Sequence, residues 1–336
     1  MMVEQIDRGR ARELSPRLSE ALEIVCNEFD GLDPHRTYRN AFSRLLKFDP
    51  LRRVTMMGTD QRDLFVPLLR QAIAEHVPAG GHVFDFGAGD GQTFALVADD
   101  VPEGTTVSLL EPNPSYVADY VAFLQRRPHL RRGIAVVAGL DDIDDVAHKT
   151  GVDLPAPHSV DLALGLHMIY FTADPRAALT RMIRFIKPGG ALFSVVTDTQ
   201  SAYIGSVLRE FVDAGGDTGD TQRRLAAIEE RRRLLAPDAE GGGALVGALG
   251  SEDIGIEVSA VRQPSRLYGH SLADLLALGI IGDLVDVPGA SKFEAAARTL
   301  RDRPEEVDLR IETHGPRTGM WSVTQPQWVT VVSRSR

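Results

Sequence analysis

The fold is decided by one stretch of the chain, Val83-Phe84-Asp85-Phe86-Gly87-Ala88-Gly89-Asp90-Gly91. Its apolar start predicts a short strand, and the glycines after it predict a tight turn that leads into a helix. In a strand–turn–helix unit of this kind, backbone N–H groups and the N-terminus of the helix can face a ligand. Glycine suits the turn because a side chain would block that close approach and because the turn can require a positive φ. The stretch therefore predicts a ligand-binding loop.

Strands and helices alternate along the chain after the helix breaker Pro78-Ala79-Gly80-Gly81. The expected strands are residues 82–86, 106–110, 134–138, 160–166 and 191–196, and the expected helices are residues 93–98, 114–125 and 177–186. Repeated β–α units give a parallel sheet that is covered by helices on both faces. We therefore predict an α/β fold with a Rossmann-like sheet.

Helical patterns flank this alternating region. Residues 4–77 are expected to be helical, with apolar side chains at helical spacing from Leu14 to Val25. After the last predicted strand we expect a helix at 202–235, a Gly- and Ala-rich loop at 236–250, a strand at 254–261, helices at 271–278 and 293–300, and two strands within 318–332 that Pro326 separates. The predicted domains are a helical cap at 1–77 and a second domain at 78–336, in which a helical insertion at about 202–310 covers a substrate cleft.

The composition argues against several classes of function. The formal net charge of −10 disfavours a nucleic-acid or anionic-membrane partner, because phosphate-rich surfaces bind clustered Lys and Arg. Cys26 is the only cysteine, so no intramolecular disulfide can form, and the histidines lack the spacing of metal ligands. The first residues do not resemble a signal peptide, and no apolar run approaches the ~20 residues of a membrane span. We expect a cytoplasmic protein without a metal.

Glu111 closes the second predicted strand, 20 residues after Gly91. A carboxylate at this place can accept hydrogen bonds from both hydroxyls of a ribose. Dinucleotide-binding turns have the spacing G-x-G-x-x-G, whereas Gly87, Gly89 and Gly91 give G-x-G-x-G. This spacing, with Glu111 and with Lys187-Pro188-Gly189-Gly190 before a strand, resembles the class I S-adenosylmethionine (SAM)-dependent methyltransferases, and the resemblance covers residues 78–196.

Within this class, the chain resembles the histamine N-methyltransferase group over most of its length. The similar segments are the helical start with Tyr38 and Phe42, Leu110-Glu111-Pro112, and Leu166-His167-Met168-Ile169-Tyr170-Phe171 followed by Asp174-Pro175. The resemblance implies a class I methyltransferase sheet with a helical cap and an insertion after the sheet. His167 stands where the group usually has glutamine, and the group's substrate-anchoring acid and its C-terminal asparagine have no direct equivalents. Histamine is therefore not the expected substrate.

The resemblance also implies the residues of the cofactor site. Gly87, Gly89 and Glu111 would contact SAM, Asp141 would reach the adenine, and Leu166 would pack near the sulfonium. Asp85 and Gly91 belong to the same loop. For Asp85 two roles remain open: it contacts the amino group of SAM, or it only holds the glycine loop through backbone hydrogen bonds.

The expected acceptor site is less well defined. We expect catalytic roles for His167 and Tyr38, and substrate contacts from Phe42, Asp60, Tyr170, Phe171 and Gln325. The alternative for His167 is a buried histidine with satisfied hydrogen bonds, and for the aromatic residues it is packing. Asp60 is the acid that could replace the group's anchoring residue, and Gln325 or Gln327 falls near its asparagine.

The predicted function is SAM-dependent methyl transfer to a small-molecule acceptor, a natural product or another metabolite with an N, O or C nucleophile. The alternatives are C-methylation of an indole, O-methylation of a carboxylate or phenol in secondary metabolism, and SAM binding without turnover by a regulatory protein. The nucleic-acid enzymes are disfavoured because their Asn/Asp-Pro-Pro-aromatic motif is absent after the fourth strand. The oligomeric state is left open.

Overall fold

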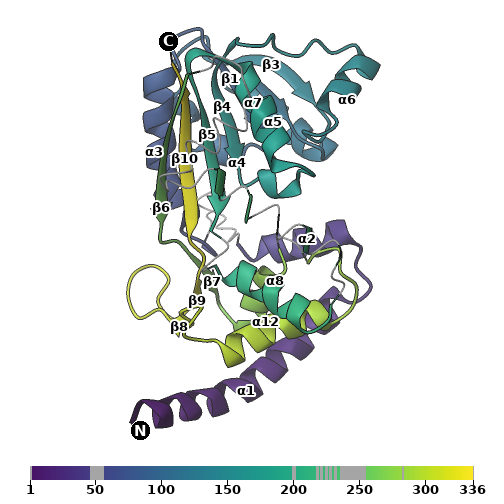
Figure 1. Cartoon of the computed structure of the whole chain (residues 1–336), viewed down its shortest axis with the longest axis vertical. Coiled ribbons are helices and arrows are strands. Elements are labelled where there is room, and N and C mark those ends of the chain that lie inside the picture. Colours follow the sequence, from purple (N-terminus) through teal and green to yellow (C-terminus); the bar gives the residue numbers. More distant parts are fainter. Residues whose placement is uncertain are drawn as a thin grey trace. The chain divides into compact units, whose positions relative to one another are not determined.

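The computed structural model describes residues 2–45, 57–198, 202–216, 255–281 and 284–335, with isolated positions between 219 and 234 (Figure 1). The side chains of residues 2–13 and of Tyr170 lie outside the described part. The chain forms two compact units. The first comprises Met1–Gln61, Thr197–Ala226 and Pro264–Pro326, and the second comprises Arg62–Val196, Ala227–Gln263 and Gln327–Arg336.

The second unit contains a seven-stranded sheet with the order β3-β2-β1-β4-β5-β10-β6. Its strands are β1 (His82–Phe86), β2 (Thr106–Leu110), β3 (Arg131–Val136), β4 (Val160–Leu166), β5 (Ile186–Thr197), β6 (Ile256–Gln263) and β10 (Gln327–Arg334). Neighbouring strands from β3 to β5 pair in parallel, whereas β10 and β6 pair antiparallel. The carboxyl ends of β1, β2 and β4 therefore meet at one edge of the sheet. The prediction of a Rossmann-like α/β fold is confirmed.

Successive side chains of each central strand face opposite sides of this sheet, as the period of a strand requires. Val83 packs with α3 (Gln61–His76), α4 (Gln92–Ala95) and α5 (Pro114–Gln125). Phe84 and Phe86 pack on the other face with α6 (Ile143–Thr150) and α7 (Pro175–Phe185). Figure 1 shows α3 and α7 on opposite sides of the sheet. Helices therefore cover both faces.

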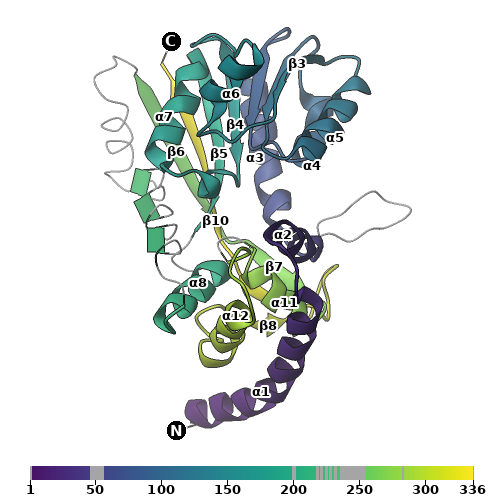
Figure 2. The same cartoon turned by 90° about the vertical axis from the view of Figure 1, so that its right-hand side faces the viewer.

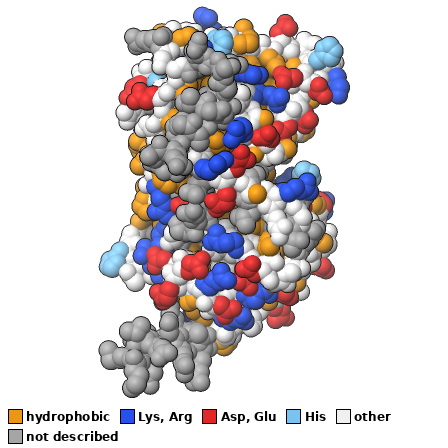
Figure 3. Space-filling model, viewed as in Figure 1, with side chains coloured by type: hydrophobic (Ala, Val, Ile, Leu, Met, Phe, Trp, Pro, Cys, Tyr) orange, Lys and Arg blue, Asp and Glu red, His pale blue; other side chains and the backbone are white. Residues whose placement is uncertain are grey.

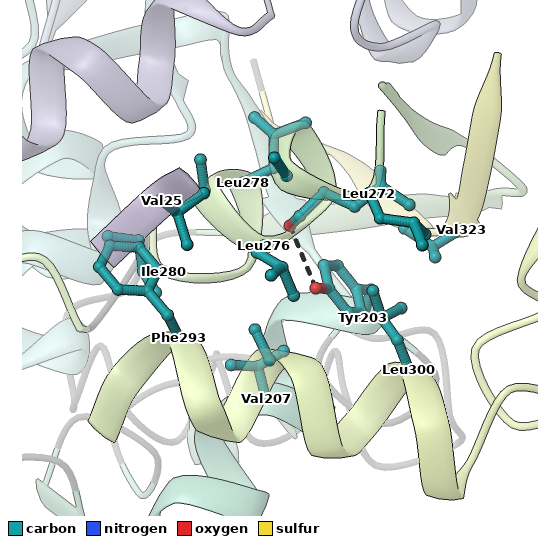
Figure 4. Packing of buried hydrophobic residues seen from close by; sticks show 14 of the residues in the cluster. Val25, Tyr203, Val207, Leu272, Leu276, Leu278, Ile280, Phe293, Leu300 and Val323 are labelled. Atoms are coloured by element: carbon teal, nitrogen blue, oxygen red, sulfur yellow. Dashed lines mark hydrogen bonds between the residues drawn. The ribbon is translucent and has the colours of Figure 1, made fainter. Parts of the chain in front are cut away.

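The first unit is built around a separate apolar core. Its helices are α1 (Met2–Phe29), α2 (Pro34–Ser43), α8 (Tyr203–Asp213), α11 (Leu272–Gly279) and α12 (Ser291–Asp302), and its small antiparallel sheet has the order β7-β9-β8 (Arg266–Gly269, Trp321–Thr324 and Arg310–Ile311). Figure 4 shows Val207, Leu276 and Phe293 in this core. The buried Tyr203 hydroxyl donates to the Leu275 carbonyl at 3.1 Å, so its polar group is satisfied inside the core.

Short polar signals in the sequence fix where several helices begin. Asp33, Asn113 and Asp174 each accept a hydrogen bond from the first turn of the helix that follows, and each precedes a proline. A side-chain acceptor at the N-cap satisfies free backbone N–H groups, and proline at the first helical position loses no hydrogen bond. These caps set the starts of α2, α5 and α7. The helices α5 and α7 follow β2 and β4, whose carboxyl ends meet at the same edge of the sheet.

Most predicted elements are present, with informative differences. β5 begins at Ile186 and so includes Lys187-Pro188-Gly189-Gly190, which we had expected to precede the strand. α6, β7 and β8 are additional elements. The predicted loop at 236–250 and part of the predicted helix at 202–235 lie outside the described residues.

The two compact units also follow boundaries that differ from those of the predicted domains. Residues 62–77 belong to the sheet unit, because Phe65, Leu69 and Ile73 pack against the sheet. The division into domains at 1–77 and 78–336 stays a prediction.

Candidate functional site

The glycine loop after β1 has three residues in the left-handed region: φ is 65° at Gly87, 57° at Gly89 and 79° at Gly91. Glycine adopts this conformation without the steric cost that a Cβ brings. A Cβ on Gly87 would collide with the Met168 side chain, and one on Gly91 would come within 2.6 Å of the Tyr120 ring. A Cβ on Gly89 would meet no atom of the protein within 4 Å. The loop is therefore packed at both ends and open at its middle glycine.

The backbone N–H groups of this loop bond to the neighbouring strand end. Gly87 and Ala88 both donate to the Leu110 carbonyl, at 2.8 and 3.1 Å, and Gly89 donates to Glu111 Oε2 at 3.0 Å. We had expected these N–H groups to face a ligand. They instead hold the loop against the end of β2, so the N–H groups of Gly87, Ala88 and Gly89 are already used within the protein.

Glu111 is the residue that joins this loop to β2. Besides the Gly89 N–H, its carboxylate accepts the N–H of Asn113 through Oε1 at 3.0 Å. Burial raises the pKa of Glu111, and the two backbone hydrogen bonds oppose that rise. Each carboxylate oxygen can accept a further hydrogen bond, so the group has capacity left for two ligand hydroxyls.

Asp85 is buried inside β1, with 3% of its surface exposed. The Tyr120 hydroxyl donates to Asp85 Oδ2 at 3.1 Å. Burial, with a smaller contribution from the charge of Glu111, raises the pKa of Asp85 to about 7, although the Tyr120 hydrogen bond opposes this rise. Burial also raises the pKa of Tyr120, so the phenol remains a donor. The side chain of Asp85 is thus hydrogen-bonded to a tyrosine of α5.

His167 follows β4 directly and has a φ of 54°, in the left-handed region that non-glycine residues rarely adopt. Its backbone N–H donates to the Val195 carbonyl at 2.9 Å. Its half-buried ring packs edge-on to Phe65 of α3, with 6.1 Å between centroids. Strained residues of this kind occur where the surrounding structure fixes them, often at functional sites.

Leu166 and Asp141 are the remaining predicted cofactor residues. Leu166 ends β4, is half-buried and packs with the cluster that contains Val83. Asp141 is exposed, and its Oδ2 accepts the N–H of Ala173 at 2.8 Å. This bond joins the turn after β3 to the start of α7, and the role of Asp141 toward the adenine stays a prediction.

Four of the expected acceptor-site residues lie in the first unit. Tyr38 and Phe42 stack along α2 with 5.7 Å between ring centroids. Asp60 Oδ1 accepts the Arg266 N–H at 2.7 Å and Oδ2 accepts the Tyr268 hydroxyl at 2.9 Å, so this carboxylate ties the residues before α3 to β7. Gln325 is fully buried, and its Oε1 accepts the N–H of Ile204 at 3.0 Å.

The other expected acceptor-site residues lie in the sheet unit. Phe171 is 60% exposed, and the side chain of Tyr170 lies outside the described part. Gln327, the alternative to Gln325, donates to Gln263 at 2.8 Å between β10 and β6. His167 and Tyr38, the predicted catalytic pair, belong to different units. Their joint role, like that of all the acceptor-site residues, stays a prediction.

Comparison with protein families decides the class of this site. A family model for a methyltransferase domain matches residues 59–237, which contain the glycine loop, Glu111 and His167. The chain belongs to the methyltransferase family. With its sheet order and glycine loop, it is a class I SAM-dependent methyltransferase, as the sequence predicts.

Solved structures resemble the methyltransferase in fold. A putative methyltransferase from Bacillus halodurans superposes with a TM-score of 0.51 at 11% identity, covering 82% of this chain and 100% of the other. A putative sarcosine dimethylglycine methyltransferase from Galdieria sulphuraria gives a TM-score of 0.45 at 9% identity, with 90% and 98% covered. No curated protein matches the methyltransferase in sequence, so its resemblance to the histamine N-methyltransferase group stays a prediction.

Sequence reasoning missed two residues that pack against the glycine loop, Tyr120 and Met168. Tyr120 lies on the buried face of α5 with Val117 and Leu124, at helical spacing. A tyrosine on such a face needs a partner for its hydroxyl, and that requirement is the signal that could have paired it with Asp85. Met168 gave no comparable signal, because its contact with Gly87 depends on how the chain turns after β4.

The surface and the described helices give further information on partners. On the face shown in Figure 3, Lys and Arg side chains lie among Asp and Glu side chains. None of the helices in the described ranges is long and apolar enough to cross a membrane. No group of His, Cys, Asp and Glu that could hold a metal ion occurs among the residues whose positions are described.

Proposed function

We propose that this methyltransferase binds SAM at the glycine loop and transfers its methyl group to a small-molecule acceptor. The observation that carries the proposal is the arrangement of Glu111 and Gly89: the carboxylate is held by the Gly89 N–H beside the open space above that glycine. A nucleoside can approach the backbone there while its ribose hydroxyls donate to Glu111.

The residues present fit the chemical groups of SAM. Its ribose carries two hydroxyl donors, and Glu111 has two carboxylate oxygens with remaining acceptor capacity. Its ammonium group is a donor and needs an acceptor, which Asp85 supplies when ionised. SAM has no phosphate, so it does not need free N–H groups from the loop, and those of Gly87, Ala88 and Gly89 are already used. A dinucleotide pyrophosphate would need such donors.

When bound, SAM supplies an electrophilic methyl carbon. The task of the protein is then to align the nucleophile with that carbon and to exclude water. Leu166 provides an apolar side chain at the end of β4. His167, the next residue, would accept the acceptor's proton if the nucleophile must lose one, because an imidazole with its ordinary pKa near ~6.5 can act as a base at neutral pH. Glutamine at this position could not.

The acceptor is a small and partly apolar molecule in this proposal. The exposed ring of Phe171 in the sheet unit is suited to a ring or hydrocarbon body, and the stacked pair Tyr38 and Phe42 gives the first unit an aromatic surface of the same kind. The net charge of −10 supports a neutral or cationic small molecule over a nucleic acid. An indole carbon, a phenol and a carboxylate remain the alternative nucleophiles, and among these a carboxylate needs no base.

Calorimetry and an activity screen test the proposal separately. SAM and S-adenosylhomocysteine should bind at micromolar levels, and NAD should not bind measurably. Labelled SAM should then methylate at least one member of a panel of indoles, phenols, amines and carboxylic acids. NAD binding without SAM binding would refute the site. SAM binding with turnover of no small molecule would instead support the regulatory alternative.

A further inference from the structure

Arg181 of α7 is bonded to the turn that follows β3 in the sheet unit. Its Nη1 group donates to the Leu140 carbonyl at 2.6 Å and to the Asp141 carbonyl at 3.3 Å. Its Nη2 group lies 3.2 Å from Oδ2 of Asp144, whose side chain is 65% exposed. An exposed ion pair of this kind contributes little to stability. The partly buried bond to the Leu140 carbonyl is therefore the stronger part of this interaction.

The contacts of Arg181 fix the orientation of the central peptide unit of the turn. The turn runs from Gly139 to Asp142 and is closed by the Asp142 N–H, which donates to the Gly139 carbonyl at 3.2 Å. The peptide unit between Leu140 and Asp141 is trans, so its N–H points away from its carbonyl. Because Arg181 holds that carbonyl, the Asp141 N–H is directed away from the guanidinium. Among the residues that the structure describes, this N–H makes no hydrogen bond.

The carboxylate of Asp141 belongs to the same turn. Its Oδ2 accepts the N–H of Ala173 at 2.8 Å, and a carboxylate with one such bond keeps acceptor capacity. Asp141 thus offers one backbone donor and one side-chain acceptor. Adenine offers the complementary pair, because its 6-amino group is a donor and the neighbouring N1 is an acceptor.

The order of the strands indicates which part of SAM would lie at this turn. The strands run β3, β2, β1 and β4 across the sheet, and all four are parallel. In the proposed function, the ribose binds at Glu111 after β2, and the methyl group faces Leu166 at the end of β4. The base and the sulfonium are attached at opposite ends of the ribose. The base would therefore lie on the far side of β2 from β4, at the end of β3.

We propose that Arg181 is a positioning residue for the base of SAM: it fixes the turn after β3 so that Asp141 binds adenine through its N–H and its carboxylate. This inference rests on the proposed function, because it concerns another group of the same ligand. Without Arg181 the central peptide unit of the turn can rotate, since type I and type II turns differ in the orientation of that unit. The Asp141 N–H would then no longer be held toward the base.

The experiment compares two ligands that differ only in the base. S-adenosylhomocysteine carries adenine, whereas S-inosylhomocysteine carries hypoxanthine, in which the 6-oxo group accepts a hydrogen bond and N1 donates one. By calorimetry, wild-type protein should bind S-adenosylhomocysteine about 100-fold more tightly, because both hydrogen bonds of Asp141 are mismatched in the other ligand. Arg181→Met should lower this preference to about tenfold or less.

Three further variants separate the contacts of Arg181. Asp144→Asn removes the ion pair and leaves both carbonyl contacts, so it should keep the wild-type preference. Arg184→Met removes an exposed arginine of the same helix and should keep it as well. Arg181→Lys should give an intermediate preference, because an ammonium group can donate to a carbonyl but lacks the planar fork of a guanidinium. Thermal melting of each variant establishes that it is folded.

The outcomes distinguish this inference from the proposed function. If wild-type protein binds neither ligand, the proposed function fails. If it binds both equally, the turn does not recognise the base, and only the inference is overturned. An equal loss of affinity for both ligands in Arg181→Met would also overturn it, because Arg181 would then only stabilise the fold. If Arg181→Met does not fold, a wild-type preference in Arg181→Lys overturns it. A loss of preference in Asp144→Asn as large as in Arg181→Met would assign the effect to the ion pair and contradict the role of the carbonyl contacts.

Discussion

The ring of Tyr120 lies directly against Gly91, while its hydroxyl donates to Asp85 at 3.1 Å. One buried side chain of α5 therefore contacts the strand before the glycine loop and the turn after it. The shape of the loop depends on this contact as much as on the glycines.

Gly91→Ala should lower the free energy of unfolding by about 2–4 kcal/mol, because the new methyl group meets the Tyr120 ring and the residue keeps a positive φ. Gly89→Ala is the matched variant, since it has a similar φ but no atom within 4 Å of its Cβ. It should cost only about 1 kcal/mol and should instead weaken S-adenosylhomocysteine. Urea unfolding and calorimetry measure both quantities. Equal stability losses in the two variants would contradict this account.

Glu111→Ala should weaken S-adenosylhomocysteine by about 2–3 kcal/mol, because two hydrogen bonds to a carboxylate are lost. The same change frees the N–H groups of Gly89 and Asn113, so the loop could also loosen. Comparing 5′-methylthioadenosine with its 2′-deoxy analogue separates the two effects. The variant should lose more affinity for 5′-methylthioadenosine than for the 2′-deoxy analogue. An identical loss of affinity for both ligands would show that Glu111 acts only through the loop.

Asp85 should make the stability of the unliganded protein fall as pH rises. Its pKa is raised to about 7 in the folded state, so the folded state holds a proton that the unfolded state has released between about pH 4 and pH 7. Stability from this group is present at low pH and is lost as pH rises through the folded pKa. Asp85→Asn removes the dependence. Its stability relative to wild type should be about 2 kcal/mol greater at pH 8 than at pH 5.

The control for this measurement is Asp119→Asn, an exposed residue of the same helix as Tyr120. It should shift stability by the same small amount at both pH values. Binding of a ligand with an ammonium group should favour ionised Asp85, so the affinity of wild-type protein for S-adenosylhomocysteine should rise through pH 7 while that of Asp85→Asn stays flat. A wild-type protein with no pH dependence in either measurement would argue against a buried carboxylate with this pKa.

His167→Asn tests the predicted base without disturbing the backbone, since asparagine tolerates a positive φ better than most residues. If His167 removes a proton from the acceptor, kcat should fall by about 10²-fold while the affinity for S-adenosylhomocysteine is unchanged. If His167 only positions the acceptor, KM should rise and kcat should be retained. Wild-type kinetics would assign the residue to packing against Phe65.

The sheet was predictable because its signals are local. His82–Phe86 and Val160–Leu166 are mostly apolar runs of strand length, and β1 and β4 lie where these runs predict them. β7 was missed because its short segment carries Arg266, a charge whose burial depends on Asp308 and Ser322 far along the chain. Such long-range ion pairs leave no pattern in the segment itself.

The residues of the candidate site also differ in how far the local sequence predicts them. The glycine spacing and Glu111 are close in sequence and follow strands, so sequence alone placed them together. The partner of Asp85 depends on how α5 packs on the sheet. His167 and Tyr38 belong to different units, and their predicted roles stay predictions.

The path of the chain has a consequence for synthesis of the protein. β10 lies between β5 and β6 in the sheet, yet it follows every other strand of that sheet in the sequence. It also follows Pro264–Pro326, the last segment of the first unit. While residues before 327 leave the ribosome, the edges of β5 and β6 have no partner strand, and unpaired edges of this kind promote aggregation. A nascent chain that stalls there would be a natural client for chaperones that shield exposed strand edges.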